Sequence, residues 1–168
     1  MRRFALALFA ALSIEPAVAA EPLGRGASGF PVPRFVSLSS DKVNVRMGPT
    51  HQHKVKWTFI KSGLPVEVVS EHFNWRRVRD ADGEEGWIHH TLLSGRRMGL
   101  ITPWSRQATL PLRTRPNENA KPAALLEPSV LVEINGCDGM WCAVSAGPVR
   151  GFVQQRSVWG VYPNERLD

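Results

Sequence analysis

The chain has 168 residues, 43% of them hydrophobic, and its 21 Lys and Arg against 15 Asp and Glu give a net charge of +6. This composition excludes a chain that is disordered throughout, and the length allows one domain or two small ones. The 13 prolines and 14 glycines are typical of compact modules that contain many turns.

The beginning of the chain has the pattern of a secretory signal peptide. Arg2 and Arg3 form a positive start, residues 4–12 are an apolar run, and small residues at 17–20 offer a cleavage site. We therefore predict a signal peptide over residues 1–20 and export to the periplasm, with secretion from the cell as the alternative. The apolar run is shorter than the roughly 20 residues that a membrane-spanning helix needs. The alternative is that the segment is not cleaved and serves as a membrane anchor.

Residues 21–33 are rich in Gly, Pro and Ser and predict a flexible or extended lead-in. A first module then covers residues 34–93. Short runs rich in Val, Ile, Phe and Trp, several of them alternating with polar residues, predict its strands. These strands are expected at residues 35–38, 43–46, 57–60, 66–70, 75–79 and 85–89.

Residues 94–107 predict a connector, and residues 108–168 a second module with a C-terminal extension. The second module repeats the landmarks of the first in the same order and at similar spacing, which indicates a duplicated fold. The paired stretches are 43–49 with 110–116, 66–69 with 130–132, 75–78 with 141–144, and 86–88 with 151–153. Frequent turns and almost no helical pattern predict an all-β fold with a small barrel or sandwich in each half.

Cys137 and Cys142 are the two cysteines of the chain. Because export brings a chain into an oxidising compartment, we predict that they form a disulfide across a tight hairpin turn. A metal site or a reactive thiol is the alternative, but zinc ordinarily has four ligands and no second cysteine pair exists.

The landmarks resemble those of the bacterial SH3-like domain. The resemblance rests on the order Val-Asn-Val-Arg-x-Gly-Pro, Gly-x-x-Val, Trp-x-x-Val and Gly-Trp-Ile, at residues 43–49, 63–66, 75–78 and 86–88. In the second copy Arg115 stands in place of the motif's Gly and Phe152 in place of its Trp. The mature chain also resembles exported tandem SH3-like proteins of Gram-negative bacteria, whose second copy carries a Cys-x4-Cys turn and ends on Trp-Gly-Val-Tyr-Pro, here residues 159–163. The resemblance implies two tandem small SH3-like β-barrels that bind peptides or cell-wall material, often without catalysis.

The candidate ligand-binding residues are Trp57, Arg76, Arg96 and Arg97. Trp57 stands beside Lys56 in a polar stretch, whereas most of the other tryptophans are expected in the cores or between the modules. The arginines belong to a cluster that could attract an acidic partner, and a solvated surface is the alternative. The cluster comprises Arg76, Arg77, Arg79, Arg96 and Arg97.

We predict no metal, no cofactor and no catalytic residues. His89 and His90 are adjacent on a strand and point to opposite faces, and residues 80–85 favour a hairpin turn over a calcium loop. The sequence contains no Gly-x-Ser-x-Gly nucleophile elbow, no His-Glu-x-x-His zinc-binding helix and no glycine-rich phosphate-binding loop. A hydrolase built from scattered Asp, Glu and His is the alternative. Nucleic acid is not an expected partner of an exported chain without a recognition helix.

Together these features predict a non-enzymatic periplasmic binding module that recognises peptidoglycan peptides or an envelope protein. The alternative is a structural or assembly protein that adheres to the anionic cell envelope through its basic residues.

Overall fold

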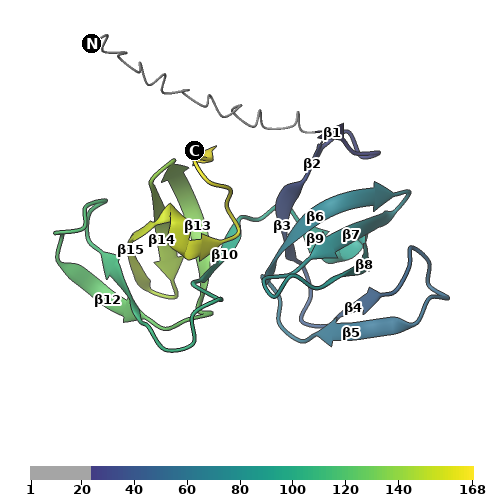
Figure 1. Cartoon of the computed structure of the whole chain (residues 1–168), viewed down its shortest axis with the longest axis horizontal. Coiled ribbons are helices and arrows are strands. Elements are labelled where there is room, and N and C mark those ends of the chain that lie inside the picture. The colour runs from purple at the N-terminus through teal and green to yellow at the C-terminus, as the bar shows by residue number, and fades with distance from the viewer. Residues whose placement is uncertain (1–23) are drawn as a thin grey trace, which may run out of the picture.

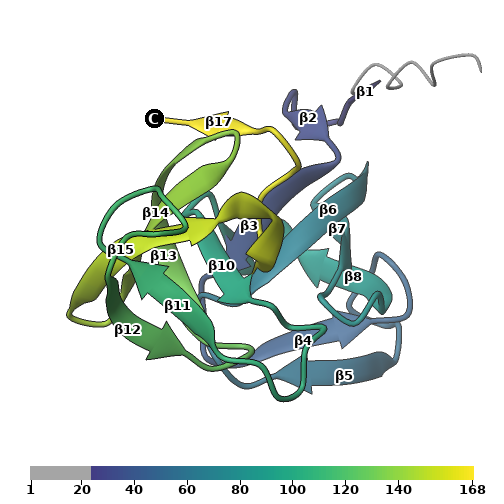
Figure 2. The same cartoon turned by 60° about the vertical axis from the view of Figure 1, so that its left-hand side comes forward.

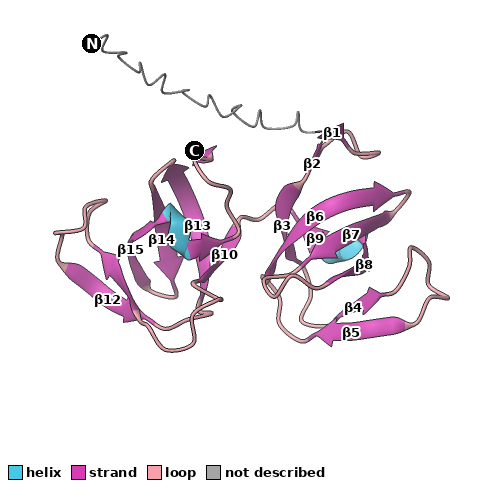
Figure 3. Cartoon of the chain, viewed as in Figure 1, coloured by secondary structure: helices cyan, strands magenta, loops and turns pink. Residues whose placement is uncertain are grey.

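The computed structural model describes residues 24–168, so the predicted signal peptide lies outside the described residues. Two curled antiparallel sheets, one from each half of the chain, lie side by side (Figure 1). Strands and loops make up nearly all of this described part, and its helices are two single 3₁₀ turns (Figure 3). The predicted all-β fold with a small barrel in each half of the chain is confirmed.

The first sheet has the strand order β5-β4-β8-β7-β6-β3-β9. Its strands are β3 (Arg34–Leu38), β4 (Val43–Arg46), β5 (Val55–Phe59), β6 (Pro65–His72), β7 (Trp75–Arg79), β8 (Glu85–His89) and β9 (Leu93–Ser94), with η1 (His90–Leu92) before β9. All six predicted strands are present, and those at 43–46, 75–79 and 85–89 have the predicted bounds. The alternating pattern predicted β4 and β8 well because every second residue of these strands is buried.

The second sheet has the order β12-β11-β15-β14-β13-β10-β16, which repeats the first order strand for strand. Its strands are β10 (Met98–Ile101), β11 (Leu110–Arg113), β12 (Pro122–Leu126), β13 (Leu131–Asp138), β14 (Trp141–Ala146), β15 (Val149–Gln154) and β16 (Val158–Trp159), with η2 (Gln155–Ser157) before β16. A short strand β17 (Arg166–Leu167) adds to the outer end of β13. The duplication predicted from the landmarks therefore extends to the topology.

Two segments differ in detail from the sequence prediction. Within the lead-in, β1 (Gly24–Arg25) and β2 (Pro31–Val32) pair as a short hairpin, so the described backbone there is extended and folded back on itself. Within the predicted connector, β10 pairs with β13 and β16 of the second sheet. Because glycines and arginines surround β10, the sequence pattern did not predict this short apolar strand. We propose that the second module begins at β10.

Each sheet closes around its own apolar core. The first core is formed by small and branched side chains that point inward from alternate positions, among them Val43, Val45 and Ile88. The second core has the same character and includes both cysteines, whose predicted disulfide is confirmed. At the ladder position of the disulfide, the first module carries a buried ion pair, Glu71–Arg76, with 3.1 Å between Oε1 and Nε.

Aromatic side chains join the two modules. Phe35 of β3 packs edge-on against Trp159 at a centroid distance of 5.0 Å and lies 4.8 Å from the ring of Tyr162. The Tyr162 hydroxyl donates to Glu67 at 3.0 Å, and burial together with the Glu67 charge raises the pKa of Tyr162 above its ordinary value. In Figures 1 and 2, β3 and β10 lie in the middle of the molecule, where these contacts are made. The barrels therefore pack against each other.

Candidate functional site

A cleft of about 760 Å³ opens on the second module. Its walls are the β11–β12 loop, the β13–β14 turn, η2 and the C-terminal segment 161–164. These elements come from separate parts of the sequence, and the barrel brings them to one place. The cleft is therefore the candidate binding site.

Three tryptophans line the cleft. Trp141 begins β14, Trp159 ends β16, and Trp104 lies in the loop between β10 and β11 with 60% of its surface exposed. Met140 at the β13–β14 turn adds a flexible apolar side chain that is 75% exposed. Tryptophan offers a large apolar surface with few rotatable bonds, so it binds ligands at a low entropic cost.

The polar lining consists mainly of amides. Asn117, Asn119, Gln154, Gln155 and Asn164 contribute amides, whereas Glu118 and Arg156 contribute one charge of each sign. Glu118 accepts a hydrogen bond from Gln154, which ties the β11–β12 loop to β15. An amide both donates and accepts hydrogen bonds, as a peptide backbone does.

Two lining residues carry a buried polar atom that has no hydrogen-bond partner among residues 24–168. They are Gln155, through Oε1, and Trp159, through Nε1. Gln155 is only 3% exposed, and its Nε2 donates to the carbonyls of Tyr162 and Glu165. Buried polar atoms without a partner are unfavourable, and because these two have almost no accessible surface, a ligand reaches them only after a side chain moves.

Local hydrogen bonds hold the β13–β14 turn that carries Met140 and Trp141. The backbone N–H groups of Trp141 and Met140 donate to Asp138 Oδ1 at 2.7 and 2.8 Å. These bonds hold the pKa of Asp138 below its ordinary value. The disulfide between Cys137 and Cys142 closes the base of the same turn. The hydrogen bonds to Asp138 and the disulfide therefore both restrain the turn.

The C-terminal wall of the cleft also faces the first module. Val161 and Pro163 line the cleft, whereas Tyr162 reaches Glu67 of β6. Glu165 of the same segment accepts hydrogen bonds from both terminal nitrogens of Arg97, at 2.9 and 3.0 Å. Packing between the barrels therefore supports one wall of the cleft.

The structure places Trp57 on the first barrel, away from this cleft. Its ring is half-buried against the core and lies edge-on to Phe59 at 5.9 Å. Its outer contact is Lys56, whose Nζ lies 5.0 Å from the ring centroid. Trp57 was chosen because of its polar neighbours in sequence, but adjacent strand residues point to opposite faces, so those neighbours do not indicate exposure. We therefore replace it with the cleft tryptophans as the candidate.

The candidate arginines make structural ion pairs. Arg76 is buried on Glu71, Arg96 reaches Glu133 at 3.1 Å, and Arg97 is held by Glu165. The other two members of the cluster are paired as well, Arg77 with Glu85 at 2.7 Å and Arg79 with Glu67 and Glu85 at 3.2 and 2.8 Å. Arg76 and Arg97 are largely buried in their pairs, whereas Arg96 stays exposed, so Arg76, Arg96 and Arg97 remain predicted ligand contacts that the structure places outside the cleft.

Three further features concern metal binding, membrane spans and the predicted turn at residues 80–85. In the part of the chain from residue 24 on, no three His, Cys, Asp or Glu gather closely enough to hold a metal ion. Over the same residues, no helix is long and apolar enough to cross a membrane. Asp80 accepts the N–H groups of Asp82 and Glu84 at 3.0 and 2.9 Å, as in the predicted hairpin turn.

Residues 39–95 and 106–160 each match the family model of the bacterial SH3 domain. The chain therefore belongs to the bacterial SH3 domain family and carries the domain twice. No curated protein matches the chain.

Among solved structures, the chain is similar to NlpC2 from Trichomonas vaginalis over 76% of this chain and 48% of that one, at 13% identity and a TM-score of 0.34. It is similar to NlpC1 from the same organism over 86% of this chain and 51% of that one, at 14% identity and a TM-score of 0.34. The chain thus spans about half the length of these proteins. At such TM-scores neither likeness says anything about function.

Proposed function

We propose that the protein is a non-enzymatic, exported binding module that holds the peptide part of peptidoglycan in the cleft of its second barrel. The observation that carries the proposal is the cleft of about 760 Å³ lined by Trp104, Trp141 and Trp159. This volume lies within the range of roughly 300–1,000 Å³ that is usual for ligand sites.

The polarity of the cleft favours a peptide. Gln154 and Gln155 are bonded within the protein, but Asn117, Asn119 and Asn164 offer both donors and acceptors, as an extended backbone does, and the tryptophans supply apolar area for side chains. Its two charged residues, Glu118 and Arg156, cancel in net charge. A site selected for an anionic polymer would present an excess of positive charge.

The lining also favours binding over catalysis. Among the residues that form the cleft, Glu118 is the one carboxylate, and there is no His, Cys, Ser or Lys. General acid–base or nucleophilic catalysis ordinarily needs at least two such groups in contact.

Three further observations support a location in the bacterial envelope. The chain contains two bacterial SH3 domains, its first 20 residues predict export, and its disulfide suits an oxidising compartment. The rival hypothesis, a scaffold that adheres through basic residues, loses support because the arginine cluster is already ion-paired. An envelope protein with an extended segment would use the same cleft.

The test is co-sedimentation of the mature protein with purified peptidoglycan sacculi at low and at moderate salt. We expect retention at both salts, and loss of retention in Trp104→Ala/Met140→Ala, since both side chains are exposed in the cleft. The matched control is Phe30→Ala/Ile60→Ala, which removes apolar side chains that are exposed outside the cleft. Retention at low salt alone indicates charge adsorption and contradicts the proposal. No retention at either salt directs the search to a protein partner.

A further inference from the structure

The first barrel has a surface equivalent to the cleft. In the second barrel the N–H of Gln155 donates to the carbonyl of Met140 at 2.8 Å, and in the first the N–H of His90 donates to Asn74 at 2.8 Å. Trp75 pairs with His89 across β7–β8, as Trp141 pairs with Gln154 across β14–β15. Trp75 and His89 therefore stand where the second barrel has Trp141 and Gln154.

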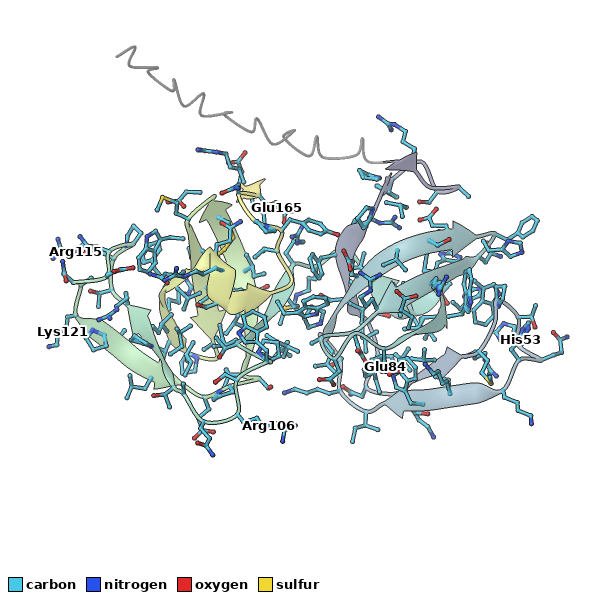
Figure 4. The ribbon with its side chains drawn as sticks, in the orientation of Figure 1. His53, Glu84, Arg106, Arg115, Lys121 and Glu165 are labelled. Carbon is cyan, nitrogen blue, oxygen red and sulfur yellow. A yellow bond between two sulfur atoms is a disulfide. The ribbon has the colours of Figure 1, made fainter. Side chains whose placement is uncertain are left out.

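The neighbouring loops match as well. The N–H of Met47 donates to Lys54 and that of Thr114 to Lys121, each at 3.0 Å, so the β4–β5 and β11–β12 loops have the same length. His51 of the first loop thus occupies the position of Glu118 in the second. Figure 4 shows His53 of the first loop at one end of the molecule and Lys121 of the second loop at the other, so the two surfaces lie far apart.

In the first barrel this surface is covered by imidazole rings. The ring of His51 stacks on that of His89 at 5.6 Å and lies edge-on to Trp75 at 4.9 Å. His89 in turn lies edge-on to Trp75 at 5.3 Å, and Trp75 is only 7% exposed. The second barrel has the Glu118–Gln154 hydrogen bond at the same place, and its Trp141 faces an open cleft. His51 and His89 therefore cover Trp75 in the first barrel, whereas the equivalent Trp141 of the second barrel is accessible from the cleft.

His89 lies close to a third histidine and to an arginine. His90 of η1 lies 4.9 Å from His89 between ring centroids, and Arg76 of β7 carries a fixed positive charge. Burial, then His90, His51 and Arg76, lower the pKa of His89 below its ordinary value. The same barrel carries His72 at the end of β6, His53 of the loop, whose carbonyl accepts a hydrogen bond from Arg46, and Glu71, which is already paired with Arg34 and Arg76. No ion pair among residues 24–168 includes a histidine.

We propose that the first barrel carries a second ligand site that opens in acid, with His51 and His89 as its gate and the C-terminal carboxylate of a peptide as its ligand. At neutral pH the stacked rings cover Trp75. When both rings are protonated they repel each other, the β4–β5 loop separates from His89, and Trp75 becomes accessible. The exposed surface then has positive charges without a counter-ion, which a carboxylate supplies.

The gate can be tested without a ligand, by following the indole N–H signal of Trp75 in NMR spectra from about pH 7.5 to about pH 5. We expect the signal to move in the wild type with a midpoint below pH 6.5, because the folded state resists protonation of His89. His51→Glu/His89→Gln rebuilds the pair of the second barrel and should remove the transition. His53→Ala, in the same loop, is the control and should keep it. A wild-type signal that does not move, or a transition that persists in the double variant, overturns the gate.

The ligand is tested with acetyl-Ala-Ala as the free acid and as its C-terminal amide. We expect the acid to shift the Trp75 signal with an affinity roughly tenfold higher at about pH 5.5 than at about pH 7.5. The amide should have little effect at either pH because it lacks the carboxylate. No response to the acid at the lower pH, or an equal response to the amide, overturns the carboxylate site. These results do not depend on whether the second barrel binds peptidoglycan.

Discussion

Glu71→Gln gives a direct test of how the first barrel is held together. The Glu71 carboxylate accepts hydrogen bonds from Ser28 N at 2.7 Å, Ser28 Oγ at 2.8 Å and Arg34 Nη2 at 2.7 Å. It also pairs with Arg76 Nε at 3.1 Å, and its side chain is 1% exposed. One carboxylate thus links the N-terminal hairpin, β3 and β7 at the position where the second barrel has its disulfide.

The expected loss of stability is about 3 kcal/mol. Breaking a buried ion pair by neutralising one partner costs roughly 3–5 kcal/mol, because the remaining charge stays buried. The lower end applies since glutamine keeps one acceptor oxygen and the volume of the side chain, and since Arg34 stays 19% exposed. Urea denaturation at neutral pH, followed by tryptophan fluorescence, measures the loss. A loss below about 1 kcal/mol would show that the pair behaves like a surface pair and would refute the reasoning.

The pH dependence of the same pair has a definite sign. Burial alone would raise the pKa of Glu71, but the hydrogen bonds from Ser28 and Arg34 and the charge of Arg76 hold it below its ordinary value of 4.5. The carboxylate therefore contributes its full stabilisation above about pH 4.5 and loses it as the pH falls through the lowered pKa. The difference in unfolding free energy between wild type and Glu71→Gln should narrow below that pH. A constant difference would contradict this assignment.

Three further variants test other contacts. Glu71→Cys/Arg76→Cys should form a new disulfide, since the ladder position is that of Cys137 and Cys142; mass spectrometry after alkylation without reduction shows whether the bond forms. Tyr162→Phe removes the hydroxyl bond between the barrels and should cost about 1.5 kcal/mol in urea denaturation; an unchanged midpoint would mean that the bond contributes nothing. Cys137→Ser/Cys142→Ser removes the bond that closes a very short loop and should lower the free energy of unfolding by about 2 kcal/mol. The same variant should bind sacculi more weakly, because the adjoining turn lines the cleft. Unchanged binding would show that the turn keeps its conformation without the disulfide.

The sequence predicted the barrels better than the site. Strand positions followed from local alternation, and the duplication followed from repeated short motifs, because both are properties of neighbouring residues. The disulfide followed from two cysteines in a chain predicted to be exported. Strand β10 was missed because its four residues lie among glycines and arginines, and its pairing with β13 joins distant parts of the chain.

The cleft could not be found from the sequence because its walls come from four separate segments. Trp141 was assigned to packing rather than to a ligand surface, yet it stands at the ladder position of the buried Trp75. The two differ because His51 and His89 cover Trp75, and such a contact between a loop and a strand has no local signature. The ion pairs of the arginines have no local signature either, since their carboxylate partners lie on other strands or, for Arg97, in the C-terminal segment.

The most direct test of the central claim is an NMR titration of the mature protein with a soluble muropeptide at about pH 7.5, where the proposed gate of the first barrel is closed. The six tryptophans give six indole N–H signals. We expect saturable shifts of Trp104, Trp141 and Trp159 and none of Trp57 or Trp75. Shifts confined to the first barrel, or no shifts at all, would contradict a peptide site in the cleft of the second barrel.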